Sequence, residues 1–234
     1  MKLAREGIRE VAAGTMVLGL LFVAAWIWLW PAAFLVGAVW IWFVAFFRDP
    51  ARRIACRAGE FCAPADGTIT EITHLDHDPD VGGPALRIGV FLSLFNVHAN
   101  RSPCTARVTG VRHEPGRFLD ARHPDSGRVN EANTVTLEPE GGLTGPVVVR
   151  QVAGRVARRI VCHARPGTRL AAGERFGMIK FGSRTELILP ADGSESAVGI
   201  GQRVRAGSTI IARQVAPEPV NAATAAEPMV SMET

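Results

Sequence analysis

The stretch MIKFGSRTELILP, residues 178–190, decides how the C-terminal half of the chain folds. Its apolar and β-branched residues predict two strands, and Gly182–Ser183 between them predicts a break. A glycine within a strand usually marks a bulge or a close approach of another backbone. On the pattern alone, we therefore interpret Gly182 as a bulge or as a point where another backbone approaches closely.

Short β-type runs of the same kind follow one another from about residue 54 onward. Turn residues separate them, and no long amphipathic helix lies between them. The clearest runs are GTITEIT (67–73), ALRIGVFLS (85–93), TARVTGVRH (105–113), NTVTLE (133–138), RFGMIKFG (175–182) and STIIARQV (208–215). This pattern predicts a mainly β domain, an antiparallel sandwich or barrel with short connections. The turn PADG occurs at 64–67 and again at 190–193, and such glycine-turn-strand units also suggest the flattened sandwich of lipoyl and biotinyl carriers.

An uncharged segment precedes these runs. Residues 11–47 contain no charged side chain and hold all five tryptophans of the chain. A domain of this size could not bury so much apolar surface, so lipid is the expected environment. The segment is too long for the apolar part of a signal peptide. Pro31 divides it into 14–30 and 32–47, each close to the length that spans a bilayer, which predicts a helical hairpin that crosses the membrane or dips into it.

Basic residues flank the hairpin on both sides and predict that both of its ends lie on the cytoplasmic side. They are Lys2, Arg5 and Arg9 before it, and Arg48, Arg52 and Arg53 after it. We therefore expect a membrane-associating hairpin over residues 1–53, a β domain over 54–215 at the cytoplasmic face of the cell (inner) membrane, and a disordered tail over 216–234. The net charge of +4 fits attraction to an anionic lipid surface.

Composition argues against several other classes of protein. Nucleic acid is not an expected partner, because the arginines are scattered among apolar strands and the chain has no tyrosine. No CxxC pair occurs, so reduced packing thiols are expected rather than a zinc or redox site. The cysteines concerned are Cys56, Cys62, Cys104 and Cys162. The oligomeric state stays open, a homo-oligomer included.

Three polar segments are candidates for a site. In VFLSLFNVHANRSP, residues 90–103, an apolar strand leads into Asn96, His98 and Asn100, which alternation places on one face. The acidic segment HLDHDPD, residues 74–80, lacks the ligand pattern of a calcium or zinc site, so a solvated loop without metal is expected. The polar loop HPDSGRVNE at 123–131 could line a pocket with three side chains: Asp125, Arg128 and Asn130.

Ser183 is a candidate nucleophile, because the sequence also offers a possible base and a possible carboxylate partner for it. A serine nucleophile needs a base, and the base needs an orienting carboxylate. Asp66 before a turn, His98 at a strand end and Ser183 at the strand break would supply these groups. The motif G-x-S-x-G is absent, so an α/β-hydrolase elbow is not supported. One interpretation is therefore a membrane-tethered serine hydrolase, whose chain would stay intact.

A non-catalytic interpretation is a membrane-tethered β-sandwich that serves as a carrier or adaptor. Carrier domains need a modifiable lysine at a hairpin tip. The only lysine after the hairpin is Lys180, and it lies inside a strand run, which counts against this interpretation.

Several segments together resemble one known family. They are APADGTITEI (63–72), VFLSLFNVHANRSP (90–103), ERFGMIKFGSRTELILP (174–190) and GQRVRAGSTIIA (201–212), after an apolar hairpin that ends in FFRDP (46–50). In this combination the chain resembles the short form of the phosphatidylserine decarboxylase proenzymes, which are pyruvoyl-dependent membrane enzymes. The resemblance covers nearly the whole chain except the tail.

The resemblance implies that the chain cleaves itself between Gly182 and Ser183. Cleavage would leave a β chain of residues 1–182 and an α chain of residues 183–234. Ser183 would become a covalent pyruvoyl group, the one cofactor implied, and no metal is implied. A glycine before the serine suits this step, because it permits a bent peptide whose carbonyl the serine can approach.

The resemblance also implies roles for two further residues and a substrate. His98, oriented by Asp66, would take the proton of Ser183 during cleavage. The pyruvoyl group would then form a Schiff base with phosphatidylserine and act as electron sink while CO2 leaves, which yields phosphatidylethanolamine. His98 would return a proton to the product carbon.

The chain departs from the family pattern in places. The familiar tripeptide is Gly-Ser-Thr, and here Arg184 follows Ser183; Phe181 replaces a common leucine, and Phe95 stands where long-form relatives carry an additional histidine. Arginine makes bidentate contacts with phosphate and carboxylate groups. We therefore expect Arg101 and Arg184 as candidates for binding the substrate's phosphate or carboxylate.

Overall fold

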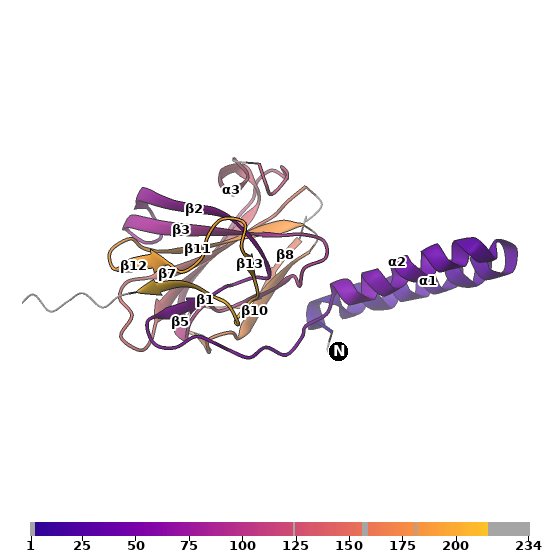
Figure 1. Ribbon diagram of the computed structural model, residues 1–234, viewed down its shortest axis with the longest axis horizontal. Helices are drawn as coiled ribbons and strands as arrows, with labels where there is room; N and C mark the ends of the chain where they lie inside the picture. Colours follow the sequence, from indigo (N-terminus) through magenta and orange to yellow (C-terminus); the bar gives the residue numbers. More distant parts are fainter. Residues whose placement is uncertain (1–2, 124, 156–158, 181, 215–234) are drawn as a thin grey trace, which may run out of the picture.

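The computed structural model describes residues 3–123, 125–155, 159–180 and 182–214. Within them an apolar helical hairpin leads into a domain built of strands (Figure 1). The helices are η1 (Arg5–Gly7), α1 (Ile8–Trp28), α2 (Trp30–Phe46) and α3 (Ser126–Val129). The strands are β1 (Glu60–Cys62), β2 (Gly67–Asp78), β3 (Gly83–Leu92), β4 (Ala99–Arg101), β5 (Ala106–Glu114), β6 (Ala132–Pro139), β7 (Val147–Val152), β8 (Arg159–Cys162), β9 (Arg169–Leu170), β10 (Arg175–Lys180), β11 (Ser183–Pro190), β12 (Ser194–Ser196), β13 (Arg203–Val204) and β14 (Ile210–Gln214).

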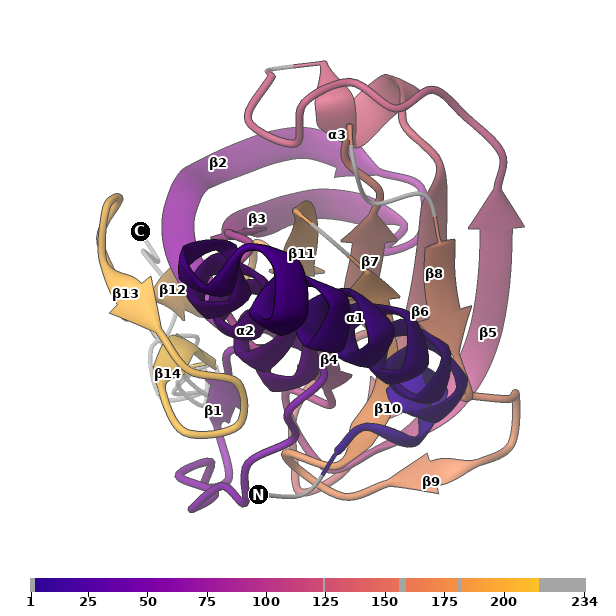
Figure 2. The same ribbon diagram turned by 90° about the vertical axis from the view of Figure 1, so that its right-hand side faces the viewer.

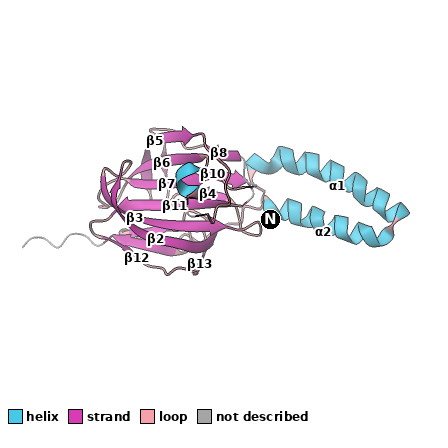
Figure 3. Ribbon diagram, turned by 90° about the horizontal axis from the view of Figure 1, so that it is seen from above, coloured by secondary structure: helices cyan, strands magenta, loops and turns pink. Residues whose placement is uncertain are grey.

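The predicted hairpin is present. Helices α1 and α2 lie side by side and project from one end of the β domain (Figures 1 and 3). No residue of α1 is buried, and α1 is long and apolar enough to cross a membrane, whereas α2 is shorter at 17 residues. The break between them falls at Leu29 rather than at Pro31, because proline is tolerated in the first turn of a helix, where its missing N–H has no intrahelical partner. The apolar surface of the hairpin fits membrane association.

Eight strands form one antiparallel sheet in the order β13-β2-β3-β11-β7-β6-β5-β9. Figure 2 shows this sheet curving around the interior, with the hairpin in front of it. Two smaller sheets, β1-β14-β12 and β4-β10-β8, complete the domain. The prediction of a mainly β, antiparallel domain behind a hydrophobic hairpin is confirmed.

Strand β11 runs through the middle of the large sheet, between β3 and β7, and begins with Ser183 opposite Leu92. Successive side chains of a strand point to opposite faces of its sheet. Leu187 belongs to the main hydrophobic cluster, so Ser183, four residues earlier, shares this inner face. Arg184 and Glu186 lie on the outer face. The two residues after the strand break therefore point in opposite directions.

Residues 74–78 of the acidic segment are part of a strand. Strand β2 pairs with β3 as far as Asp78, which lies opposite Gly83. The prediction of a loop over 74–80 is wrong for these five residues, because the ladder continues to the tight turn that Asp78 stabilises. Its Oδ1 accepts hydrogen bonds from the backbone N–H groups of Asp80 and Val81.

The cysteines also depart from expectation. Cys56 and Cys62 form a disulfide, with their Cα atoms 5.7 Å apart. The prediction of four reduced thiols is wrong for this pair, because the chain turns back on itself within the five residues between them. Cys104 and Cys162 are free. The predicted tail at 216–234 lies outside the described residues.

Candidate active site

Gly182 lies where the chain passes from one sheet to another. Strand β10 pairs with β4 and β8, whereas β11 pairs with β3 and β7. Gly182 is therefore not a bulge within one sheet, because the strands before and after it belong to different sheets. Of the two alternatives, the close approach of another backbone is the one that is found, at Gly154. Gly182 has φ +63°, in the left-handed region that favours glycine. The chain bends sharply at this residue.

The carbonyl group of Gly182 is closely packed. A Cβ atom on Gly154 would lie only 2.1 Å from the Gly182 oxygen, so the two backbones can approach only because residue 154 is a glycine. The peptide between Gly182 and Ser183 is thus bent on one side and held at its oxygen.

The Ser183 hydroxyl is buried without a partner. Its side chain is fully buried, and Oγ makes no hydrogen bond within the described part of the chain. A buried hydroxyl without a hydrogen bond is costly and uncommon, so it calls for an explanation such as a reaction at this atom. Ser194 shares this property at the start of β12.

His98 lies beside the bent peptide. The Gly182 N–H donates a hydrogen bond to His98 Nε2 at 3.2 Å, and His98 Nδ1 is 3.0 Å from the Asn96 carbonyl oxygen. A carbonyl oxygen only accepts, so Nδ1 carries the proton and Nε2 is the acceptor. Burial lowers the pKa of His98 to about 4; the hydrogen bond to Asn96 opposes this change and the charge of Arg48 adds to it. The imidazole is therefore neutral at physiological pH and able to accept a proton.

The end of the hairpin covers this histidine. The ring of Phe46 lies 4.4 Å from the His98 ring, centroid to centroid, and both side chains are buried. Arg48 donates hydrogen bonds to the carbonyl oxygens of Ala45 and Phe95, which ties the end of α2 to the loop before His98. The sequence pattern missed Phe46 because it belongs to the apolar run assigned to lipid.

Asp66 has partners other than His98. Its Oδ2 accepts from Arg52 at 2.6 Å, and its Oδ1 accepts from the Ala206 N–H at 2.8 Å. Among the described residues, the hydrogen-bond partner of His98 Nδ1 is Asn96, so the expected Asp66–His98 contact is not formed. The catalytic role of Asp66 stays a prediction. Arg52, read from the sequence only as a membrane flank, is its ion-pair partner.

The two arginines expected to bind substrate are also engaged. Arg101 binds Asp49 and donates to the Gly173 carbonyl oxygen at 2.9 Å, which fastens β4 to the base of the hairpin. Arg184 pairs with Glu71 and Glu186 on the outer face of the large sheet, away from Ser183. Either arginine would have to give up these partners to hold a substrate.

A buried chain of polar side chains joins the strands around the site. Asn133 donates to Gln151, Gln151 donates to Asn100, and Asn100 donates to Thr185, at 2.9, 2.8 and 3.0 Å. These residues come from β6, β7, β4 and β11. Because Thr185 is two residues after Ser183, this row of hydrogen-bonded side chains fixes β11 against the segment that carries His98. Alternation in the sequence had indicated only that Asn100 shares a face with His98.

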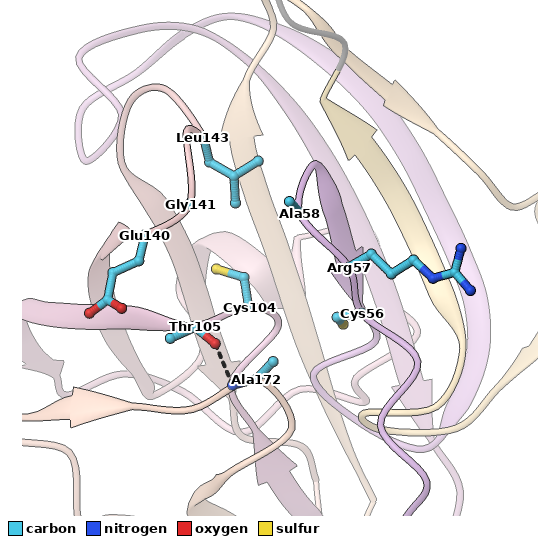
Figure 4. Close-up of a pocket in the computed structure, with 9 residues that line it drawn as sticks. All are labelled: Cys56, Arg57, Ala58, Cys104, Thr105, Glu140, Gly141, Leu143 and Ala172. Atoms are coloured by element: carbon cyan, nitrogen blue, oxygen red, sulfur yellow. Dashed lines mark hydrogen bonds between the residues drawn. The ribbon is translucent and has the colours of Figure 1, made fainter.

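Two cavities bear on the question of a substrate site. One of about 700 Å³ opens beside the loop before His98, and its lining includes Asp66, Phe95, Asn96, Arg203 and Arg205. The other, of about 280 Å³, is shown in Figure 4. Its lining includes Cys56, Cys104, Thr105, Glu140 and Leu143. One end of β6 lies near Ser183 and the other lies far from it. This cavity lies beyond the far end, so it is not part of the site around Ser183.

The polar loop at 123–131 lines a pocket with two of its three expected side chains. Asp125 and Arg128 lie on the wall of a cavity of about 350 Å³ whose lining also includes Arg184 and Glu186. Asn130 bonds the backbone of Leu119 and Ala153 and thereby braces the loop. Asp125 and Arg128 pair with each other at the surface. Among the described residues, no group of three or more His, Cys, Asp and Glu side chains could hold a metal ion.

Known proteins resemble this chain over most of its length. The family model described as phosphatidylserine decarboxylase matches residues 39–212. The phosphatidylserine decarboxylase proenzyme of Rhodopirellula baltica is 47% identical, covering 89% of this chain and 87% of the relative. The proenzyme of Nitrosomonas eutropha is 42% identical over 90% and 94%, and that of Paraburkholderia phytofirmans is 42% identical over 90% and 96%. The chain therefore belongs to the phosphatidylserine decarboxylase family of enzymes.

Proposed function

We propose that this chain is a self-processing enzyme that converts phosphatidylserine to phosphatidylethanolamine and CO2 at the cytoplasmic face of the cell membrane. The observation that carries the proposal is the arrangement at the strand break. The Ser183 hydroxyl, which is buried and has no hydrogen bond among the described residues, follows a bent glycine peptide that touches a neutral His98. The proenzyme names of the relatives support it. The basic residues on both flanks of the hairpin support the cytoplasmic side.

Cleavage of the peptide bond requires only groups of this chain, and formation of the pyruvoyl group also uses one water molecule. Ser183 Oγ attacks the Gly182 carbonyl carbon, the peptide C–N bond breaks, and the Ser183 nitrogen takes a proton, which leaves an ester. Loss of the Ser183 Cα proton and of the Gly182 carboxylate gives dehydroalanine. Water then replaces its nitrogen, which leaves as ammonia, and residue 183 becomes a pyruvoyl group. The β chain ends at Gly182 as a carboxylate.

His98 is the base in this scheme. Its Nε2 accepts only a long hydrogen bond from the Gly182 N–H, at 3.2 Å, and can exchange that bond for the Ser183 hydroxyl. The hydrogen bond from Nδ1 to Asn96 keeps Nε2 unprotonated. Asp66 acts at a distance, through the segment that it and Arg52 hold in place.

The pyruvoyl group would supply an electron sink for the decarboxylation, as pyridoxal phosphate does in other enzymes. Residue 183 fits this use because it is buried on the inner face and lies beside an imidazole that can return a proton to the product. The cavity of about 700 Å³ opens beside the loop that precedes His98. Its Arg203 and Arg205 suit a phosphodiester, and the exposed Phe95 suits the acyl region of a bilayer.

The carrier interpretation loses support. Lys180 is buried in β10, and its Nζ donates to Glu10 Oε1 at 2.5 Å and to the Glu6 carbonyl oxygen at 3.1 Å. A lysine held in this way cannot be presented at a hairpin tip for modification. The serine hydrolase interpretation uses the same Asp66, His98 and Ser183 but leaves the chain intact, so it makes a different prediction.

The test is an activity assay with the full chain in vesicles that contain phosphatidylserine. The proposal predicts release of CO2, formation of phosphatidylethanolamine, and inactivation by phenylhydrazine, which labels residue 183 of the shorter fragment. Ser183→Ala should abolish all three, whereas Ser194→Ala should abolish none, although its hydroxyl is likewise buried without a hydrogen bond among the described residues. Labelling of Ser183 in an uncut chain by a fluorophosphonate, with hydrolysis of the lipid, would establish the hydrolase instead.

A further inference from the structure

Arg184, the second residue after the proposed cleavage site, is held on the outer face of the sheet by two carboxylates. Arg184 Nε donates to Glu186 Oε1 at 2.8 Å, and Arg184 Nη2 donates to Glu71 Oε2. The side chains of Arg184 and Glu186 are 7% and 1% exposed. Arg87 binds the same Glu71 at 2.5 Å, from the neighbouring strand β3. We call Arg184, Glu71 and Glu186 the Arg184 anchor.

Two glycines leave room for the Arg184 anchor. A Cβ atom on Gly89 would lie 2.7 Å from Arg184 Nη2, and one on Gly127 would lie 2.7 Å from Glu186 Oε1. Burial alone would raise the pKa of Glu71, but its hydrogen bonds and charge contacts with Arg184 and Arg87 outweigh burial and lower it. The carboxylate is therefore ionised at neutral pH, and the guanidinium has a fixed charge to bind.

The backbone around Ser183 is held less completely than the rest of β11. Ser183 pairs with Leu92 of β3, and pairing with β7 begins only at Arg184, opposite Val152. Cleavage turns Ser183 into the first residue of a chain. Chain ends fray unless they are tied down, and a pyruvoyl group at a fraying end would leave the imidazole.

We propose that Arg184 is a positioning residue that fixes the Gly182–Ser183 peptide for cleavage and then holds the new chain end in the sheet through the Arg184 anchor. This inference rests on the proposed self-cleavage. In this inference Arg184 binds Glu71 of the β chain and not the substrate, because Arg184 and Ser183 lie on opposite faces of β11. A threonine at this position would be too short to reach Glu71.

The test compares Arg184→Met with Arg87→Met in the full chain. Arg87→Met is the matched control, because it removes an arginine from the same carboxylate and the same face but leaves β11 unchanged. Each proenzyme is made by cell-free translation with lipid nanodiscs, and cleavage is followed by time. Arg184→Met should slow cleavage on the order of tenfold to a hundredfold, the loss typical of a misplaced reacting group. Arg87→Met should cleave at the wild-type rate.

Two further measurements separate positioning from a loss of folding. Arg184→Met should show faster hydrogen exchange at residues 183–186, and in its cleaved fraction kcat should fall while KM for phosphatidylserine stays constant. If Arg184→Met does not fold, Arg184→Met/Glu186→Gln is used, since it removes the buried carboxylate charge as well. Arg184→Lys, which keeps the charge but reaches only one carboxylate, should recover part of the cleavage rate.

The possible failures are distinct. If the wild type cleaves and Arg184→Met cleaves as fast, with unchanged exchange, the positioning role is overturned while self-cleavage stands. A raised KM with normal cleavage would overturn it in favour of substrate binding by Arg184. Equal slowing by Arg87→Met would also overturn it, because the effect would then come from Glu71 alone. An uncut wild type would instead contradict the proposed function.

Discussion

Phe46→Ala should move the acid limit of self-cleavage. Phe46 is the last residue of α2, and its ring packs against His98 at 4.4 Å. Burial is the main reason why the pKa of His98 is lowered from 6.5 to about 4. Removing the ring exposes the imidazole to water, so the pKa should rise toward its ordinary value.

The size of the effect follows from these two values. At about pH 5.5, a histidine with a pKa of about 4 is roughly 97% neutral, whereas one with a pKa of about 6.5 is roughly 10% neutral. Cleavage by a neutral base should therefore be up to about tenfold slower in Phe46→Ala than in the wild type at that pH. Above about pH 7.5 both proteins carry a neutral imidazole, and this difference should vanish.

The assay is the rate of chain cleavage after cell-free synthesis in nanodiscs, measured from about pH 4.5 to 8. Phe46→Leu keeps an apolar cover and should retain the wild-type profile. Phe43→Ala removes a ring that packs on Phe47 in the same hairpin and should leave the profile in place. If Phe46→Ala folds and its acid limb coincides with that of the wild type, the hairpin does not set the proton affinity of His98.

Three further predictions concern stability and the charged pair near the site. Folded His98 stays neutral down to about pH 4, whereas the unfolded chain takes up a proton near pH 6.5. The uncut Ser183→Ala chain should therefore lose about 3 kcal/mol of unfolding free energy through His98 as the pH falls between these values, and comparison with uncut Ser183→Ala/His98→Gln in denaturant titrations isolates this part. The unfolding free energies of the uncut Ser183→Ala and uncut His98→Gln chains can be compared once the contribution of His98 is subtracted. Ser183→Ala should then be within about 1 kcal/mol of the other chain or more stable, because the lost hydroxyl has no partner in the described residues. A loss of stability well above this would mean that the hydroxyl is hydrogen-bonded. Arg52→Met should cost about 3 kcal/mol by leaving the Asp66 carboxylate buried without its charge partner, and Arg52→Met/Asp66→Asn should recover most of this in thermal unfolding; additive losses would contradict the pairing.

The strands and the hairpin could be predicted because their signals are local. Alternating apolar residues and turn residues mark strands wherever they pair, and an uncharged run of this length marks helices in lipid. The sequence could not decide between a bulge and a close backbone approach at Gly182, because the partners of β10 and β11 are set by contacts far away in the sequence. The disulfide between Cys56 and Cys62 likewise depends on a turn that no pattern in this segment announces.

The candidate site was predictable only in part. The structure brings His98 to Gly182, which the strand end and the strand break had indicated separately. Asp66 pairs with Arg52 instead of His98, because the basic flank of the hairpin meets the turn that carries Asp66 at the base of the hairpin. The cover over His98 comes from Phe46, whose sequence context indicated lipid. A side chain such as Phe46, which belongs to an apolar helix and also covers a site residue, has no sequence pattern that distinguishes these two roles.

The intact mass of the purified full chain shows whether Ser183 becomes the cofactor. We expect two polypeptides. One comprises residues 1–182 and ends in a free carboxylate, and the other comprises residues 183–234, resists Edman degradation and is one ammonia lighter than a chain beginning with serine. Ser183→Ala should give one uncut chain. A wild-type chain that is active on phosphatidylserine but has the mass of the uncut, unmodified sequence would contradict the account.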